Sequence, residues 1–163
     1  MSSRLLSDAN PLLAEKVRTL QAQYAKRFAP WYLVITSVWR SPLEQEALYS
    51  QGRVASKLEL NAIRERAGMP PIYDEDEAHR IVTGTRHSRH NRTPSEAVDL
   101  AVAIDPDGAT GPLKAKIDWI TAGRYEAMGE MAKKLGLVWG GDWRQRDLCH
   151  VEMPREAAKV EGT

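Results

Sequence analysis

The sequence predicts an α+β fold, a single domain of 163 residues in which a small antiparallel sheet is flanked by helices. Three observations predict it. Two segments, 11–28 and 121–135, carry apolar residues at helical spacing. Residues 97–104 (AVDLAVAI) have the composition of a buried strand, and residues 137–152 have the pattern of a hairpin-like unit around a Gly-Gly turn. Helices segregated from short strands are typical of α+β domains.

Capping signals set the helix boundaries in the first third of the chain. Asn10 as the N-cap and Pro11 at the first helical position begin a helix, which Pro30 ends. Residues 31–39 are rich in β-branched and aromatic side chains and predict a strand. The motif 41–44 (SPLE) is a capping box that opens a second helix.

Residues 54–80 are predicted to form an insertion within the same domain. Ser56 and Glu59 make another capping box, which predicts a short helix. The acidic run 74–77 predicts an exposed loop, and a short strand is expected around residues 81–83. Two interpretations stay open for the insertion, because long loops are often functional: a solvated surface segment, or a lid over an active site.

Composition and charge exclude several function classes. A formal net charge of +1 predicts no broad attraction to nucleic acid or to anionic membranes. The sequence contains no run of 18 or more apolar residues, so stable membrane insertion is not expected. The first residues, MSSRLLSD, lack the apolar core of a signal peptide, so synthesis in a cytoplasm (that of a host) is expected. A monomer is also expected.

The one cysteine, Cys149, excludes an internal disulfide and a cysteine-rich structural zinc site. In an alternating strand it points to the face opposite His150. A small buried residue is therefore the expected role, ahead of a metal ligand or a nucleophile.

The most informative residues are His90, Asp99 and His150. Two imidazoles and one carboxylate are a ligand set of catalytic zinc sites, in which the fourth position holds water. Asp99 stands inside an apolar strand, where a carboxylate is costly to bury unless it is paired or bound to a metal. Asp147, three residues before His150, is placed where a general base for a bound water is needed.

Two other histidines compete for these roles. His87 is three residues before His90 and would face the same way in a turn, so an exchange of ligands stays open. His79 follows the acidic run and is expected at the surface. Each of the three predicted ligands, taken alone, also has a purely structural interpretation: a solvent-facing carboxylate for Asp99 and a loop or core histidine for the others.

These residues fall in motifs that resemble one family of zinc peptidases. Its members include D-alanyl-D-alanine carboxypeptidases, D-alanyl-D-alanine dipeptidases and phage L-alanyl-D-glutamate endolysins. The motifs are Ser-x-His at 88–90, Ala-x-Asp at 97–99 and Asp-x-x-His at 147–150, and further matches are WRS at 39–41 and LGLVWGGDW at 135–143. The resemblance spans residues 31–152 in the expected order.

The resemblance implies a hedgehog/DD-peptidase-like fold and zinc held by His90, Asp99 and His150. It implies that Asp147 is the general base and later the general acid. It further implies that Arg40 steadies the developing oxyanion and that Ser88 supports the substrate or the metal shell. Without the resemblance, Arg40 would be interpreted as a surface arginine before a helix N-cap.

Two departures from the commonest family pattern concern spacing. The step from His90 to Asp99 is nine residues rather than seven, through a Pro-Ser turn, which loops absorb. The insertion at 54–80 is longer than in compact endolysins and bears on substrate preference.

The expected function is that of an L-alanyl-D-glutamate endopeptidase acting on peptidoglycan stem peptides in the cell wall, as a phage-type endolysin. A separate membrane-permeabilising protein would release it. The alternatives are a D-alanyl-D-alanine carboxypeptidase and, in another class, a wall-binding module that holds zinc without catalysis.

Overall fold

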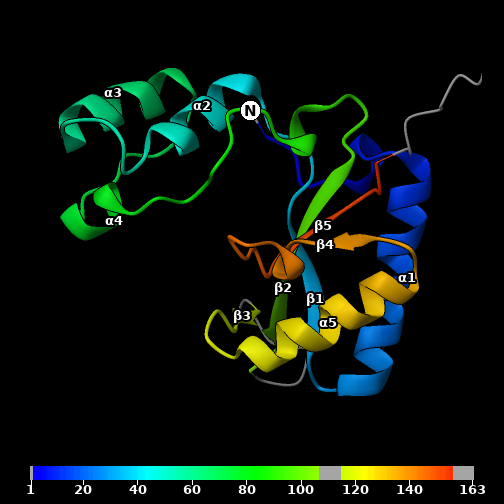
Figure 1. Cartoon of the computed structure of the whole chain (residues 1–163). Coiled ribbons are helices and arrows are strands. Elements are labelled where there is room, and N and C mark those ends of the chain that lie inside the picture. Colours follow the sequence, from blue (N-terminus) through cyan, green and yellow to red (C-terminus); the bar gives the residue numbers. More distant parts are fainter. Residues whose placement is uncertain (1, 107–114, 156–163) are drawn as a thin grey trace, which may run out of the picture. The chain divides into compact units, whose positions relative to one another are not determined.

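The structure is a computed structural model that describes residues 2–106 and 115–155 (Figure 1). The chain divides into two compact units, which are described in turn. The first holds residues 1–10 and 35–98, and the second holds residues 11–34 and 99–163. Two of the boundaries between the units fall within strands, one in the strand that begins at Tyr32 and one in the strand that begins at Ala97.

The strands are β1 (Tyr32–Ser37), β2 (Ala97–Ile104), β3 (Lys116–Ile117), β4 (Val138–Trp139) and β5 (His150–Glu152). They form one sheet in the order β1-β2-β5-β4, and β3 pairs with β2. The β2–β3 and β4–β5 pairs are antiparallel. The predicted α+β class, with a small antiparallel sheet and flanking helices, is confirmed.

Two predicted helices form the apolar body of the second unit. Helix α1 (Pro11–Phe28) and helix α5 (Ala122–Lys134) pack against each other (Figure 1). The hydroxyl of Tyr24 donates to the carbonyl oxygen of Arg124 at 3.2 Å, which links the two helices. Their buried side chains lie at helical spacing: Leu13, Val17, Leu20 and Tyr24 on α1, and Tyr125, Met128 and Ala132 on α5.

Strand β2 is buried along almost its whole length. Asp99 is the half-buried exception within the run from Ala97 to Ala103. The hydroxyl of Tyr125 accepts from the backbone N–H of Val102 at 3.3 Å and so joins α5 to this strand. Strand β3 was not predicted, because its two residues are too short to carry a pattern.

The predicted hairpin-like unit consists of β4, the 3₁₀ helix η3 (Gly140–Asp142) and β5. Val138 pairs with Glu152, and Trp139 pairs with Val151. The indole of Trp139 donates to the carbonyl oxygen of Leu148 at 2.9 Å. Its ring lies directly against Gly129 and Gly141, where a Cβ atom would collide with it, so packing against this ring requires glycine at both positions.

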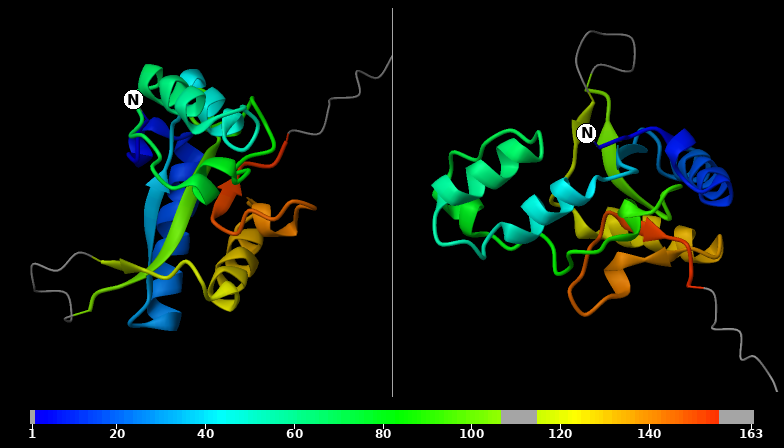
Figure 2. Two further views of the ribbon diagram at one scale, coloured as in Figure 1. Left: turned by 90° about the vertical axis from the view of Figure 1, so that its left-hand side faces the viewer. Right: turned by 90° about the horizontal axis from the view of Figure 1, so that it is seen from above.

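The first unit contains the 3₁₀ helices η1 (Leu6–Asp8) and η2 (Arg89–Asn91) and the helices α2 (Pro42–Ser50), α3 (Lys57–Arg66) and α4 (Glu75–His79). Helices α2, α3 and α4 lie together in this unit (Figure 2). The predicted N-caps are present, because the hydroxyls of Ser41 and Ser56 accept from N–H groups three residues later, each at 3.2 Å.

Two expectations for the 54–83 region are wrong. The acidic run is the start of helix α4 rather than a loop, because Asp74 caps that helix by accepting from the N–H of Glu77 at 2.7 Å. Residues 81–83 form no strand, and Ile81 is 50% exposed. The insertion and the single domain stay predictions. Residues 105–108 (DPDG), whose sequence predicts a turn, lie partly outside the described residues.

No helix among the described residues is both long enough and apolar enough to cross a membrane.

Candidate metal centre

His90 is held in place by the turn that carries it. The residue lies in η2, and the hydroxyl of Ser88 accepts from its backbone N–H at 3.3 Å. The side chain of Asn91 accepts from the N–H of Ser88 at 2.9 Å, which completes a capping box. The carbonyl oxygen of His90 accepts from the N–H of Arg40 at 3.0 Å. His90 is 1% exposed, so its ring has little freedom to turn.

A hydrogen bond to the backbone fixes the proton on the His90 ring. Its Nδ1 lies 2.6 Å from the carbonyl oxygen of Val38. A carbonyl oxygen accepts and cannot donate, so Nδ1 carries the proton. In the neutral ring the lone pair is therefore on Nε2, as in metal-binding histidines whose other nitrogen is hydrogen-bonded.

Asp99 and His150 face each other from neighbouring strands of the second unit. Oδ1 of Asp99 on β2 lies 3.1 Å from Nδ1 of His150 on β5. The other ring nitrogen, Nε2, lies 2.9 Å from Oε2 of Glu152. The His150 side chain is 7% exposed and that of Asp99 is 17% exposed, so both polar groups are largely removed from water.

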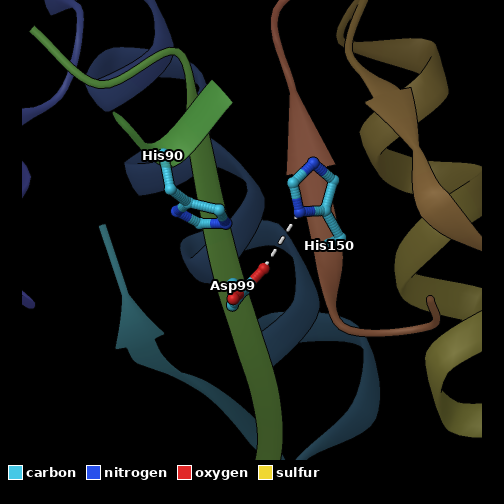
Figure 3. A group of neighbouring side chains, drawn as sticks. All are labelled: His90, Asp99 and His150. Atoms are coloured by element: carbon cyan, nitrogen blue, oxygen red, sulfur yellow. Dashed lines mark hydrogen bonds and ion pairs between the residues drawn. The ribbon is translucent and has the colours of Figure 1, made fainter. Parts of the chain in front are cut away.

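The three predicted ligands form a group of neighbouring side chains (Figure 3). One ligand atom of each of His90, Asp99 and His150 lies within 4.8 Å of the other two. Among the described residues this is the one group of three or more such side chains. Tetrahedral zinc with bonds of about 2.1 Å has neighbouring ligand atoms about 3.4 Å apart, so the donor set and spacing fit that ion.

The neighbouring carboxylates change the proton affinity of His150. Burial alone lowers its pKa, but the hydrogen bonds to Asp99 and Glu152 raise it more, and the charge of Asp147 adds to them. The net effect raises the pKa of His150 to about 9. Without a metal the ring is therefore a cation at neutral pH, and a metal ion must displace a proton from it.

Asp147 lies next to His150 in the second unit. Its N–H donates to the carbonyl oxygen of Gly140 at 2.9 Å, and its own carbonyl oxygen accepts from the N–H of His150 at 3.3 Å. Its side chain is exposed. The charge of this exposed carboxylate contributes to the raised pKa of His150, and its role as a general base stays a prediction.

Cys149, between these two residues, is half-buried. Burial raises the pKa of its thiol to about 12, with contributions from Asp147 and Asp99. Such a thiol is neither a good nucleophile nor a good metal ligand at neutral pH.

Arg40 is oriented by a buried amide of the first unit. Its Nη1 donates to Oε1 of Gln45 at 2.9 Å. Gln45 is fully buried on α2, and its Nε2 donates to the carbonyl oxygen of Thr85 at 2.7 Å. The guanidinium is thus tied through Gln45 to the segment that precedes His90.

Ser88, His87 and His79 lie outside the group of three ligand atoms. The hydroxyl of Ser88 caps η2, and its role toward a substrate stays a prediction. His87 and His79 are exposed and lie outside the metal group, so the structure favours His90 over His87 as the ligand.

Sequence reasoning missed three residues at this site: Glu152, Gln45 and Gly140. Glu152 follows His150 by two positions in a strand, which places both side chains on one face, and this signal was available. Gln45 has no such signal, because a glutamine on a helix is ordinarily exposed. Gly140 lies so close to Asp147 and His150 that a Cβ atom would be 3.1 Å from the Cβ of each.

A separate hollow of about 330 Å³ lies elsewhere in the second unit. Its lining contains none of the predicted site residues and consists of Trp31, Ile104, Lys116, Ile117, Asp118, Trp119 and Ile120.

Comparison with known proteins shows which peptidases the chain resembles. A family described as D-alanyl-D-alanine carboxypeptidase matches residues 82–153, the range that contains all three predicted ligands and Asp147. The chain is therefore similar to this peptidase family over the segment that carries the predicted ligands. A relative from Bacillus subtilis (strain 168), the peptidoglycan L-alanyl-D-glutamate endopeptidase CwlK, is 29% identical over 155 residues. That match covers 90% of this chain and 74% of the relative.

A solved structure supports the fold. The L-Ala D-Glu endopeptidase ChiX of Serratia marcescens is similar to this chain with a TM-score of 0.52 at 16% identity. The similarity covers 94% of this chain and 89% of that one. The two chains therefore share a fold over most of their length, as the predicted fold requires.

Proposed function

We propose that this protein is a zinc-dependent hydrolase of peptidoglycan stem peptides that cleaves the bond between L-alanine and D-glutamate. The observation that carries the proposal is the group of two imidazoles and one carboxylate, with Asp147 beside it. The similarity to CwlK along 90% of the chain supports the substrate and the bond.

Zinc is the ion that this donor set favours. His90 would bind it through Nε2, because its Nδ1 proton is donated to Val38. Asp99 would supply a carboxylate oxygen and His150 a ring nitrogen. Three protein ligands leave one position open, as catalytic zinc sites require. When bound, zinc acts as a Lewis acid that polarises a peptide carbonyl and lowers the pKa of water at the open position.

Asp147 would move the proton during the reaction. Its exposed carboxylate accepts a proton from the attacking water and then gives it to the nitrogen of the leaving amine. A wall-binding module that merely held zinc would not need a base at this place, so Asp147 weighs against that alternative.

Arg40 would stabilise the negative charge that develops on the substrate carbonyl oxygen. A preoriented cation is effective in this role because it does not reorganise when the charge appears. The hydrogen bond from the Arg40 side chain to the buried Gln45 supplies this orientation. The backbone N–H of Arg40 also donates to the carbonyl oxygen of His90.

A second candidate is the D-alanyl-D-alanine carboxypeptidase activity after which the matching family is described. That reaction requires recognition of a free C-terminal carboxylate, and the endopeptidase reaction requires the cleft to stay open at that end. The exposed guanidinium groups of Arg86 and Arg92 would serve either a terminal carboxylate or the free α-carboxylate of D-glutamate.

The experiment is digestion of purified sacculi with zinc-loaded protein, followed by mass spectrometry of the products. We expect peptides with a free N-terminal D-glutamate, with L-alanine left on the glycan. Release of D-alanine alone would assign the chain to the carboxypeptidases. Asp147→Asn protein is the control for contaminating hydrolases, and metal-free protein with full activity would refute the zinc dependence.

A lytic role as a phage endolysin is part of the proposal and needs its own test. Zinc-loaded protein added to cells with a permeabilised outer barrier should lower their turbidity, and the Asp147→Asn protein should not. Sacculus cleavage without lysis would separate the reaction from the role.

A further inference from the structure

A second carboxylate, Glu152, contacts the histidine that Asp99 contacts. Its Oε2 lies 2.9 Å from Nε2 of His150, on the side of the ring opposite Asp99. Glu152 is 8% exposed and pairs through its backbone register with Val138, so it is fixed in the sheet. Both residues project from the same face of β5, because they are two positions apart in a strand.

The ring of His150 thus lies between two carboxylates, and only one of them belongs to the predicted ligand set. Asp99 belongs to the group of three ligand atoms, whereas Glu152 does not. A neutral imidazole has one protonated and one unprotonated nitrogen. Nδ1 of His150, which lies by Asp99, can bind a metal ion together with that carboxylate only if the proton of the neutral ring is on Nε2.

We propose that Glu152 is a positioning residue for the metal site: it accepts the Nε2–H of His150 and so directs Nδ1 to the metal. The proposal rests on the zinc site of the proposed function and assigns a role to a residue that is not itself a ligand. Carboxylate partners of this kind fix the orientation of the ring and the location of its proton, and they raise the basicity of the ligand.

The two histidines are then fixed by different means. His90 donates its Nδ1 proton to the backbone carbonyl of Val38, which leaves Nε2 for the metal. His150 donates its Nε2 proton to the side chain of Glu152, which leaves Nδ1. A backbone partner cannot be removed by substitution, but Glu152 can, so the role is open to a direct test.

The test measures zinc affinity by competition with a chromogenic chelator in wild-type, Glu152→Ala and Glu152→Gln proteins. Loss of an outer partner of a ligating histidine weakens metal binding by about 10–100-fold, which is the expectation for Glu152→Ala. The amide oxygen of Glu152→Gln still accepts Nε2–H, so that variant should stay within about fivefold of wild type. Glu15→Gln, at an exposed position of α1, is the matched control.

A second measurement does not depend on the variants. Long-range ¹H–¹⁵N spectra of zinc-loaded wild-type protein should show His150 protonated at Nε2 and metal-bound at Nδ1. Zinc bound at Nε2, or a Glu152→Ala affinity within about twofold of wild type, would overturn the role of Glu152 while leaving the zinc site intact. Wild-type protein that binds no zinc would overturn the proposed function together with this inference.

Discussion

Nδ1 of His150 lies 3.1 Å from Oδ1 of Asp99, across two neighbouring strands of the sheet. In the absence of a metal this contact is an ion pair, because the nearby carboxylates raise the pKa of His150 to about 9. The same contact brings together two of the three predicted ligands. A proton and a metal ion therefore compete for one site, and two properties of the protein should depend on pH as a result.

The first pH prediction concerns the stability of the zinc-free protein. The pKa of His150 is about 9 in the folded chain and 6.5 in the ordinary case, so the folded state binds the proton more tightly. This contribution, on the order of 3 kcal/mol, is complete below pH 6.5 and is lost as pH rises through 9. Urea unfolding from pH 6 to 9.5 should show the decline. His150→Gln should flatten it, and an exposed-site control, His79→Gln, should not.

The same competition makes zinc binding pH-dependent. Below pH 9 each bound zinc ion must displace the His150 proton, so affinity should rise about tenfold per pH unit and level off near pH 9. Isothermal titration calorimetry in buffers of different ionisation enthalpy measures the protons released. Release of no proton at pH 7 would contradict the raised pKa of His150.

Removal of a ligand should abolish the stabilisation by zinc. A ligand present at 100 times its dissociation constant stabilises the folded state by about 2.7 kcal/mol, which raises the Tm of a chain of this size by roughly 5 to 10 °C. His90→Ala and His150→Ala should lose this shift. His79→Ala, on the exposed end of α4, should keep it in the same thermal melt. A full shift in His90→Ala would show that His90 is not a ligand.

Much of the fold could be predicted because its elements carry local signals. Helices α1, α2 and α3 have capping residues and helical spacing, and β2 is a long apolar run, so each was predicted to within a few residues. Helix α4 was mistaken for a loop because its acidic residues were interpreted by charge alone. Asp74 as an N-cap and the acidic first turn, which favours the helix dipole, decide the outcome.

The candidate site was predictable where chemistry is unusual and unpredictable where packing decides. A carboxylate in an apolar strand identified Asp99 without any structural knowledge. Gln45 and Gly140 were missed because their roles depend on their neighbours in the fold. The sequence alone does not indicate that the amide of Gln45 is buried or that other atoms approach Gly140 closely. The neighbour that matters to Gln45, the carbonyl oxygen of Thr85, is 40 residues away.

Asp147→Asn separates the base from the ligands. The side chain is not one of the three ligand atoms, so the variant should bind zinc as wild type does. It should lose about a hundredfold or more in the rate of sacculus digestion, as expected when a general base is removed. Loss of zinc in Asp147→Asn, together with its retention in Asp99→Asn, would show that the two aspartates have exchanged roles.

Cys149→Ala should leave turnover within about threefold of wild type, because the thiol takes no part in the reaction and only packing changes. Burial raises the pKa of this thiol to about 12, so little thiolate exists at neutral pH. A disulfide reagent should therefore label the folded protein far more slowly than the protein in urea. Loss of zinc in Cys149→Ala would contradict the ligand set.

Gly140→Ala should damage the site without changing any group that takes part in the chemistry. An added Cβ atom would lie 2.5 Å from the carbonyl oxygen of Asp147 and 3.1 Å from the Cβ of His150, so the segment that carries base and ligand must move. Overpacking of this kind costs about 1–3 kcal/mol of stability. Turnover and zinc affinity should fall together, since both residues shift.

The matched control is Gly123→Ala near the start of α5, where an added Cβ atom meets nothing within 4 Å. Alanine is favoured over glycine in a helix by up to about 1 kcal/mol, so this variant should be as stable as wild type or more stable, with unchanged turnover. Thermal melts, zinc titration and sacculus digestion of both variants separate the two cases. If Gly140→Ala digests sacculi at the wild-type rate, the close approach of Gly140 does not position Asp147 and His150.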